Sequence, residues 1–331
     1  MLPELSLLVR LVRMVDDVPT PPPRLKGRRG APVTYPERIF LKGLLVMLLR
    51  QLTTAHALLA FLEQDDLAIA QLRAELSAPI IPSRRTWERR LAQLPQRLPE
   101  LIGSLGRRLV TELEPWLSAE GPGEGHAAAL DSTPLKTGGG VWHKRDRQQG
   151  VIPHSAIDTE AGWSKSGCHG WWFGCKLHLS VTTGHSRIPL AAEVTVANVG
   201  DNLIAPELLA ELPEDLRYLL GDAQSQDPGL REVCEERGFH LITPRRGPHP
   251  HRDDGVGVRR IFHRLRSQTM EPFNGIFKDL FGWHWRMPVR GLQKTQILAL
   301  GAVWLYQLVL RYPHRQQLEP GKGIKALLRA A

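Results

Sequence analysis

Cysteines, aromatic side chains and long apolar runs are all scarce in this chain. Its 331 residues include three cysteines, and aromatic residues make up 6% of them. An odd, low cysteine count excludes a disulfide framework and fits a reducing compartment, so we expect a cytoplasmic protein. No apolar run reaches the roughly 18 residues that cross a bilayer. The longest candidates, 39–49 and 297–310, contain Lys42 and Gln307, so no membrane partner is expected.

Positive charge, by contrast, is abundant. The chain has 43 Lys and Arg against 34 Asp and Glu, which gives a formal net charge of +9. Hydrophobic residues make up 42%, an ordinary fraction for a protein with a sizeable core. The charge balance favours a polyanionic partner, most simply nucleic acid, over a soluble protein that is merely basic.

The first third of the chain has the pattern of helices. Leucines recur at three- and four-residue spacing, which is typical of amphipathic helices. The predicted helices of this region cover 36–51, 55–62, 67–76, 83–94 and 98–114. A helical domain over 1–117, with a Pro-rich basic linker at 18–30, is therefore expected. It ends at a Gly- and Pro-containing hinge over 118–125.

The pattern changes after the hinge. Strands are predicted at 127–131, 172–181, 188–197, 216–220 and 239–243. Helices are predicted at 202–212, 228–237, 262–281 and 292–311. This mixture indicates an α/β fold over 126–315, with a mixed sheet flanked by helices, followed by a basic tail over 316–331.

Three acidic residues are candidates for a metal site. Asp131 closes an apolar run, Asp222 closes another, and Glu271 lies in a basic helical segment. A carboxylate at the end of an apolar strand is costly to keep charged unless a cation or a donor meets it. Mg²⁺ prefers oxygen ligands and keeps several waters, so two or three carboxylates suffice to bind it. The trio therefore suggests divalent metals acting on a polyanion.

Several short motifs occur in a fixed order around these acids. They are Leu-Asp-Ser-Thr at 130–133, Trp-Phe-Gly-Cys-Lys-Leu-His-Leu at 172–179, Thr-Val-Ala-Asn-Val-Gly-Asp at 195–201, Gly-Asp-Ala at 221–223 and Leu-Ile-Thr-Pro-Arg at 241–245. Six residues separate Glu271 from Lys278. Over residues 127–310 this order resembles the DDE transposases of bacterial insertion sequences, whose catalytic core is RNase H-like.

The resemblance implies a function, a cofactor and partners. It implies a nucleoid-associated transposase that binds the terminal inverted repeats of its element, cuts there, and joins 3′-hydroxyls to target double-stranded DNA. It implies a helical DNA-binding domain before an RNase H-like catalytic domain, and a dimer on paired ends. Asp131, Asp222 and Glu271 would be catalytic and would hold two Mg²⁺ ions, for which Mn²⁺ would substitute. The implied DNA-binding residues of the catalytic domain are Lys176, His178, Arg264 and Lys278.

The third acid departs from the family pattern. The family often has Tyr seven and Arg four residues before the Glu, where this chain has Arg264 and Ser267. In a continuous helix Arg264, Glu271 and Lys278 would share one stripe. Pro272 predicts either a kink or a new helix that begins there. In the second case Lys278 stays near Glu271, whereas Arg264 need not.

A second basic element lies in the helical region. Ser83 is a candidate N-cap for a helix that carries Trp87. Arginines gather on this helix at Arg84, Arg85, Arg89 and Arg90. It is expected to be either a DNA-recognition helix or a solvated helix with Trp87 in the core.

Other residues have two interpretations each. Asp201 is either a supporting residue of the metal site or the N-cap of the next helix. Trp171, Trp172, Trp283 and Trp285 either stack on unpaired bases or pack internally. Zinc at Cys168, His169, Cys175 and His178 is disfavoured, because the spacing is irregular and the last two would point to opposite faces of a strand.

Two other functions fit the same pattern. One is a metal-dependent nuclease of the same fold that does not join strands. The other is a catalytically inactive, transposase-derived DNA-binding protein, which the presence of all three acids argues against.

Overall fold

The computed structural model describes residues 6–19, 35–77, 80–119, 126–166, 170–184, 186–244, 258–316 and 323–330. Most of the predicted linker and hinge, and the start of the predicted tail, lie outside these residues, as do Cys168 and His169. Within the described residues, no helix is long and apolar enough to cross a membrane.

The N-terminal region is helical, as predicted. Its elements are α1 (Leu7–Arg13), η1 (Met14–Asp17), α2 (Glu37–Leu49), α3 (Ala55–Leu62), α4 (Leu67–Glu75), α5 (Arg84–Leu91), η2 (Leu94–Gln96) and α6 (Leu98–Ala119). Four of the helices begin at side chains that accept backbone N–H bonds. Ser6 caps α1, Thr54 caps α3, Asp66 caps α4 and Ser83 caps α5. These caps satisfy first-turn donors that a helix leaves without partners.

The second half of the chain forms a six-stranded mixed sheet. Its strands are β1 (Ala127–Lys136), β2 (Gly162–Ser166), β3 (Gly170–Thr182), β4 (Pro189–Val196), β5 (Tyr218–Leu220) and β6 (His240–Ile242). The order is β2-β3-β1-β5-β6, with β4 also paired to β3. The pairs of β3 with β1, β2 and β4 are antiparallel, whereas β5 runs parallel to β1 and β6. The predicted mixed sheet is confirmed.

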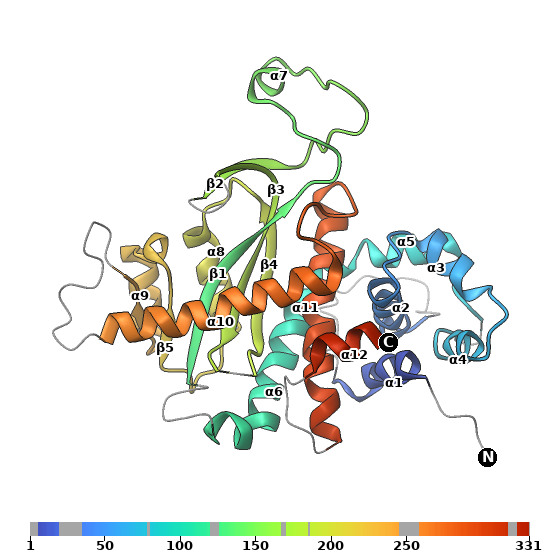
Figure 1. Cartoon of the computed structure of the whole chain (residues 1–331), viewed down its shortest axis with the longest axis horizontal. Coiled ribbons are helices and arrows are strands. Elements are labelled where there is room, and N and C mark those ends of the chain that lie inside the picture. Colours follow the sequence, from blue (N-terminus) through green and yellow to red (C-terminus); the bar gives the residue numbers. More distant parts are fainter. Residues whose placement is uncertain are drawn as a thin grey trace, which may run out of the picture.

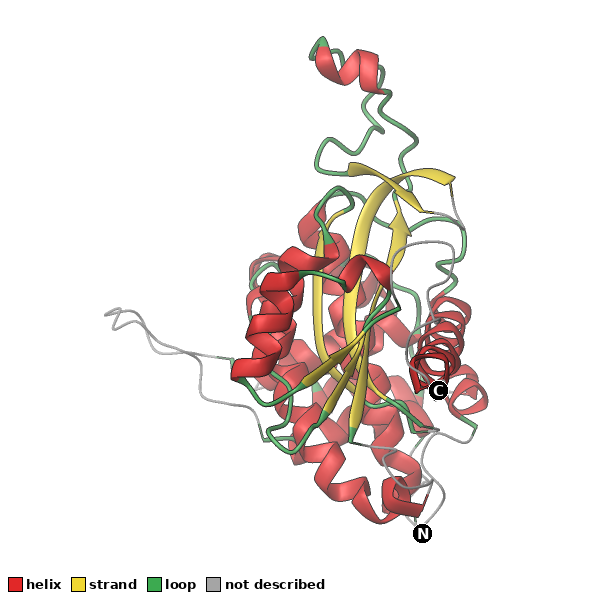
Figure 2. Cartoon of the chain, turned by 90° about the vertical axis from the view of Figure 1, so that its left-hand side faces the viewer, coloured by secondary structure: helices red, strands yellow, loops and turns green. Residues whose placement is uncertain are grey.

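Helices cover both faces of this sheet (Figures 1 and 2). The helices of this half of the chain are α7 (Lys144–Gln148), α8 (Asp201–Ala210), η3 (Ala223–Ser225), α9 (Pro228–Glu236), α10 (Val258–Phe281), α11 (Leu292–Arg315) and α12 (Ile324–Ala330). Of these, α7 projects away from the sheet (Figure 1), and α12 packs on α10 and α11. Side-chain alternation along β1 separates α10 from α8. Asp131 contacts α10, whereas the next residue, Ser132, contacts the start of α8, so the two helices lie on opposite faces.

One hydrophobic core joins the helical region to the sheet. Helix α6 packs on β4 and α11, and α11 also packs on α2. The buried amide of Gln307 in α11 donates to the carbonyls of Ile102 in α6 and Pro189 in β4, at 2.8 Å each. The backbones approach closely at Gly106, where a Cβ atom would lie 2.6 Å from the Pro189 carbonyl oxygen.

Helix α10 excludes one of the two alternatives stated for Pro272, the start of a new helix. It runs from Val258 to Phe281 with Pro272 inside it, so there is neither an interruption nor a new helix at the proline. Proline at position 272 cannot donate to the carbonyl of Gln268, one turn earlier. In the structure Arg187 Nη2 lies 3.3 Å from that oxygen and replaces the missing donor. A long-range contact therefore compensates for the proline.

Candidate active site

Asp131 lies in the middle of β1, not at a strand end as the sequence suggested. Strand β1 continues to Lys136, but its parallel pairing with β5 stops at Ala129 and Leu220. The Asp131 side chain faces α10 and is 24% exposed. Arg266 Nη2 lies 2.8 Å from Asp131 Oδ1, and Arg266 Nε donates to the Leu130 carbonyl at 3.2 Å. The guanidinium thus holds both the carboxylate and the strand.

Asp222 lies beside Asp131. Ala129 pairs with Leu220 in the parallel register, and two further residues along each strand lead to Asp131 and Asp222. Neighbouring strands are about 4.8 Å apart, so the two carboxylates project from adjacent backbones. The backbone N–H groups of Gln224 and Ser225 donate to Asp222 Oδ1 at 2.8 and 3.0 Å. These bonds fix the Asp222 side chain at the carboxyl end of β5.

The electrostatics of this pair suit an added cation. Burial raises the pKa of Asp131 to about 6; the Arg266 charge lowers it, and the Asp222 and Asp201 carboxylates raise it. In the described structure Arg266 is the guanidinium that bonds to Asp131, and Asp222 is held by backbone N–H groups. No group of three or more His, Cys, Asp or Glu able to hold a metal is found among the residues that the structure describes. Mg²⁺ usually binds through one or two carboxylates together with waters and substrate phosphates, so the Asp131–Asp222 pair fits it.

Glu271 is not brought into this pair. It lies on an exposed side of α10, whereas Met270 and Phe273 are fully buried on the side that faces the core. Glu271 shares a helical stripe with Lys278 because α10 is continuous. Burial, and then the charge of Lys136, lower the pKa of Lys278, while Asp131 raises it. Lys278 is therefore close enough to interact electrostatically with Asp131. The helical stripe that carries Lys278 borders the carboxylate pair.

Asp201 anchors a second polar cluster on the opposite face of the sheet. Its carboxylate accepts from Ser132 Oγ at 2.9 Å and from Lys176 Nζ at 3.1 Å, and lies 3.2 Å from His178 Nδ1. Burial opposes its ionisation, but the bonds and charges of His178 and Lys176 prevail and lower the pKa of Asp201 to about 2. The N-cap interpretation of Asp201 is wrong, because Gly200 occupies that position.

The two basic residues of β3 are largely enclosed in this cluster. His178 is 2% exposed, and its Nε2 lies 2.8 Å from Thr195 Oγ1. Lys176 Nζ also donates to the Val199 carbonyl at 3.0 Å. Both side chains thus support Asp201, which in turn holds Ser132, the residue after Asp131.

Helix α5 divides its residues between the core and the surface. Trp87 is fully buried against Phe40, with ring centroids 5.0 Å apart, so its placement in the core is confirmed. Arg90 stacks over the Phe40 ring at 4.9 Å, and Arg84 Nε lies 2.7 Å from Glu88. Arg85 and Arg89 are exposed. The tryptophans divide similarly: Trp172 and Trp283 are buried, whereas Trp171 and Trp285 are 67% and 84% exposed.

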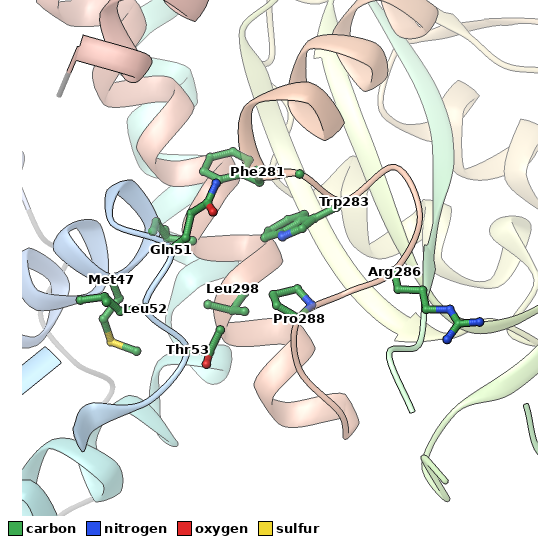
Figure 3. Close-up of a pocket in the computed structure, with 11 residues that line it drawn as sticks. Met47, Gln51, Leu52, Thr53, Phe281, Trp283, Arg286, Pro288 and Leu298 are labelled. Atoms are coloured by element: carbon green, nitrogen blue, oxygen red, sulfur yellow. The ribbon is translucent and has the colours of Figure 1, made fainter. Parts of the chain in front are cut away.

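The described surface also has a pocket of about 200 Å³ away from the carboxylates. It lies between the end of α2 and the α10–α11 connection, where Trp283, Pro288 and Leu298 point into it and Arg286 points away (Figure 3). Asp131, Asp222 and Glu271 do not line it. Because this pocket is lined mainly by apolar side chains, it is unsuited to binding a metal or a phosphate.

The sequence motifs do not include Arg266, which bonds to Asp131. Arg266 precedes Met270, Phe273 and Phe277 by four, seven and eleven residues, so it continues their buried stripe on α10. An arginine on an apolar helix face is rarely buried without a counter-ion. That pattern could have identified it as the partner of an acid in the sheet.

The sheet order, the helices on both faces and the adjacent aspartates define an RNase H-like α/β fold. The sequence matches the family described as the transposase DDE domain over residues 123–308, and the chain belongs to that family. The resemblance stated from the motifs is therefore confirmed. Searches of curated proteins and of solved structures gave no match for this chain.

Proposed function

We propose that this protein is a DNA transposase that binds the terminal inverted repeats of its element and catalyses metal-dependent end cleavage and strand transfer. The adjacency of Asp131 and Asp222 at the boundary of β1 and β5 carries the proposal. A half-buried pair of adjacent carboxylates in a transposase-family domain suits cations bridged to DNA phosphate.

Asp131 and Asp222, with Glu271 from the flank of α10, are proposed to hold two Mg²⁺ ions, which Mn²⁺ replaces. When bound, such ions stabilise the charge on the attacking and leaving oxygens of a phosphoryl transfer. The protein's own part is positioning. Backbone donors orient Asp222, and Arg266 holds Asp131 and the adjacent strand.

Basic side chains are proposed to bind the DNA. Lys278 and Arg264 lie on the α10 stripe that borders the acidic pair, so they are placed to meet the phosphates on either side of the reacting one. Lys176 and His178 contribute mainly by holding Asp201 and Ser132 in place. In the helical domain, DNA contacts are assigned to Arg84, Arg85, Arg89 and Arg90 of α5.

The domain and assembly assignments belong to the same proposal. A helical DNA-binding domain over 1–117 and a catalytic domain over 126–315 flank the hinge at 118–125, and the basic tail covers 316–331. Two protomers pair on the two element ends, on nucleoid DNA.

Two assays separate this proposal from its alternatives. Strand transfer from a duplex with a pre-cut 3′ end distinguishes a transposase from a nuclease, which would cleave DNA but give no joined product. Mg²⁺ or Mn²⁺ binding to the DNA-free protein tests the inactive alternative. We expect Asp222→Asn to weaken metal binding and Glu232→Gln, at an exposed site on α9, to leave it unchanged. Absence of metal binding in the unsubstituted protein would favour the inactive form.

A further inference from the structure

We propose that residues 137–161, here called the arm, form a rigid strut that binds the phosphate backbone of duplex DNA, beginning about six base pairs from the reacting phosphate. This inference rests on the proposed function, because Asp131 sets the origin of the distance. Figures 1 and 2 show the arm projecting from one end of the sheet, with α7 near its tip.

Strand β1 fixes the distance from the acidic pair to the arm. From Asp131 the strand continues to Lys136 and passes directly into Thr137. Six residues at about 3.3 Å each span about 20 Å. Duplex DNA rises about 3.4 Å per base pair, so 20 Å corresponds to about six base pairs. A duplex following β1 from Asp131 would therefore meet the arm at that point.

Contacts between its own residues hold the arm in one conformation. Trp142 Nε1 donates to the Val151 carbonyl, and Trp163 Nε1 donates to the Trp142 carbonyl, each at 2.8 Å. Arg147 lies over the Trp142 ring at 5.6 Å and donates to the Ala161 carbonyl at 3.3 Å. These contacts tie the outgoing and returning legs to each other and to β2.

The two acidic residues at the base of the arm, Asp158 and Glu160, accept hydrogen bonds from the protein's own backbone. Asp158 is 4% exposed, and its Oδ2 accepts from Gly291 N at 2.9 Å. Glu160 Oε2 accepts from Leu292 N at 2.6 Å. Both carboxylates thus meet N–H groups at the start of α11, where negative charge is favourable. These two carboxylates hold the base of the arm against α11. Their negative charge lies there and not at the tip, where DNA phosphate is proposed to bind.

The outer part of the arm carries mainly positive charge. Lys144, Arg145 and Arg147 are exposed there beside one acid, Asp146, which is partly buried. Between the tip and Asp131 lie Lys136 and Lys278, which interact with each other electrostatically. Positive groups therefore continue from the acidic pair to the tip, as a phosphate backbone requires.

A second copy of the chain is the competing occupant. Val141, Val151 and Ile152 of the arm are 38%, 49% and 53% exposed. The charge beside them favours DNA, because two like-charged arms would repel each other.

The test uses Lys144→Gln/Arg145→Gln in the full chain, which keeps Arg147 and its internal contacts. The matched control is Arg217→Gln/Arg231→Gln, an exposed pair near β5 and α9, far from the arm in Figure 1. The probe is a 5′-labelled duplex of about 40 base pairs ending in the inverted repeat that flanks the gene. Hydroxyl-radical footprints and the salt dependence of binding are measured.

We expect the arm variant to lose protection that begins about six base pairs from the reacting phosphate. Its slope of log affinity against log salt should fall by roughly 1.8, or about 0.9 for each lost phosphate contact. Protection of the terminal phosphate should remain, and the control should keep the arm footprint.

An unchanged footprint and slope in the arm variant, with cleavage by the unsubstituted protein intact, would overturn the arm inference alone. Loss of self-association by the arm variant with an unchanged footprint would assign the arm to a second copy and overturn it as well. Absence of metal-dependent cleavage by the unsubstituted protein would instead refute the proposed function, and with it the arm's register.

Discussion

At the residue scale, the ion pair of Asp131 and Arg266 is the main local feature of the site. Its atoms are 2.8 Å apart, and the side chains are 24% and 12% exposed. A guanidinium and a divalent cation would compete for the same carboxylate. The proposed metal site therefore predicts that this pair weakens when metal binds.

A double-mutant cycle tests that competition. With Asp131→Asn and Arg266→Met, we expect a coupling energy of about 1–3 kcal/mol in unfolding without divalent metal. With saturating Mg²⁺ the coupling should fall toward zero. The measurement is urea unfolding of the four proteins with and without the ion. Coupling that is the same in both conditions would show that the cation does not bind at Asp131.

Glu75 gives a prediction about pH. Burial raises its pKa, but bonds from Lys42 and Arg13, with their charges, prevail and lower it below 4.5. A lowered folded pKa gives stability that is complete above the unfolded pKa and is lost as pH falls through the folded pKa.

Glu75→Gln should therefore destabilise the protein near pH 7 by about 1.5–3 kcal/mol, the usual contribution of hydrogen bonds to charged groups. The difference from the unsubstituted protein should shrink below about pH 4.5. Unfolding free energies measured between pH 3 and 7 check this. A constant difference across that range would contradict the role assigned to the carboxylate.

At the element scale, α10 shows how a distant residue rescues a local defect. Proline in a helix interior costs about 3 kcal/mol relative to alanine. Arg187 supplies a donor to the Gln268 carbonyl, which the proline leaves without one. The sequence left a new helix at Pro272 as an alternative because Arg187 lies 85 residues away and its contact depends on the fold.

Pro272→Ala should stabilise the protein by up to about 3 kcal/mol. Arg187→Met should cost about 1 kcal/mol with Pro272 present, and less in the alanine background, where a backbone N–H meets Gln268. Thermal unfolding of the two single variants and the double variant measures this dependence. Equal effects of Arg187→Met in both backgrounds would contradict the compensation.

Regular elements were predictable where the local pattern was strong. The helices α2 to α5 and the strands β3 and β4 lie within about three residues of their predicted ranges, whereas α6 and β1 continue past their predicted ends to Ala119 and Lys136. The short elements α7, β2 and α12 were not predicted. Their segments are brief, without a clear period, and β2 exists only through its pairing with β3. The sequence indicated Asp131 and Asp222, but only the parallel register places them side by side.

At the scale of the whole molecule, the helical region and the sheet are packed as one body. Gly106 of α6 lies against the Pro189 backbone of β4, and Gln307 of α11 bonds to both elements. Leucine periodicity predicted α6 as a helix, but it did not indicate that α6 packs on the sheet. Such contacts depend on residues that are far apart in the sequence.

Gly106→Val should therefore destabilise both regions together. Its Cβ would lie 2.6 Å from a backbone oxygen that cannot move freely, and overpacking of this kind costs about 1–3 kcal/mol. Far-ultraviolet circular dichroism and tryptophan fluorescence should report one coincident transition at lower denaturant. An early transition confined to one signal would show that the regions unfold independently.

The central claim is that Asp131 and Asp222 form one metal-dependent centre for DNA cleavage. It is tested most directly by Mg²⁺-dependent cleavage of end-containing duplex DNA with Asp131→Asn, Asp222→Asn and the control Glu232→Gln. Metal catalysis supplies several kcal/mol, so each aspartate variant should lose roughly 10³-fold or more in rate while still binding the duplex. The control should cleave normally. Full cleavage by either aspartate variant would contradict the account.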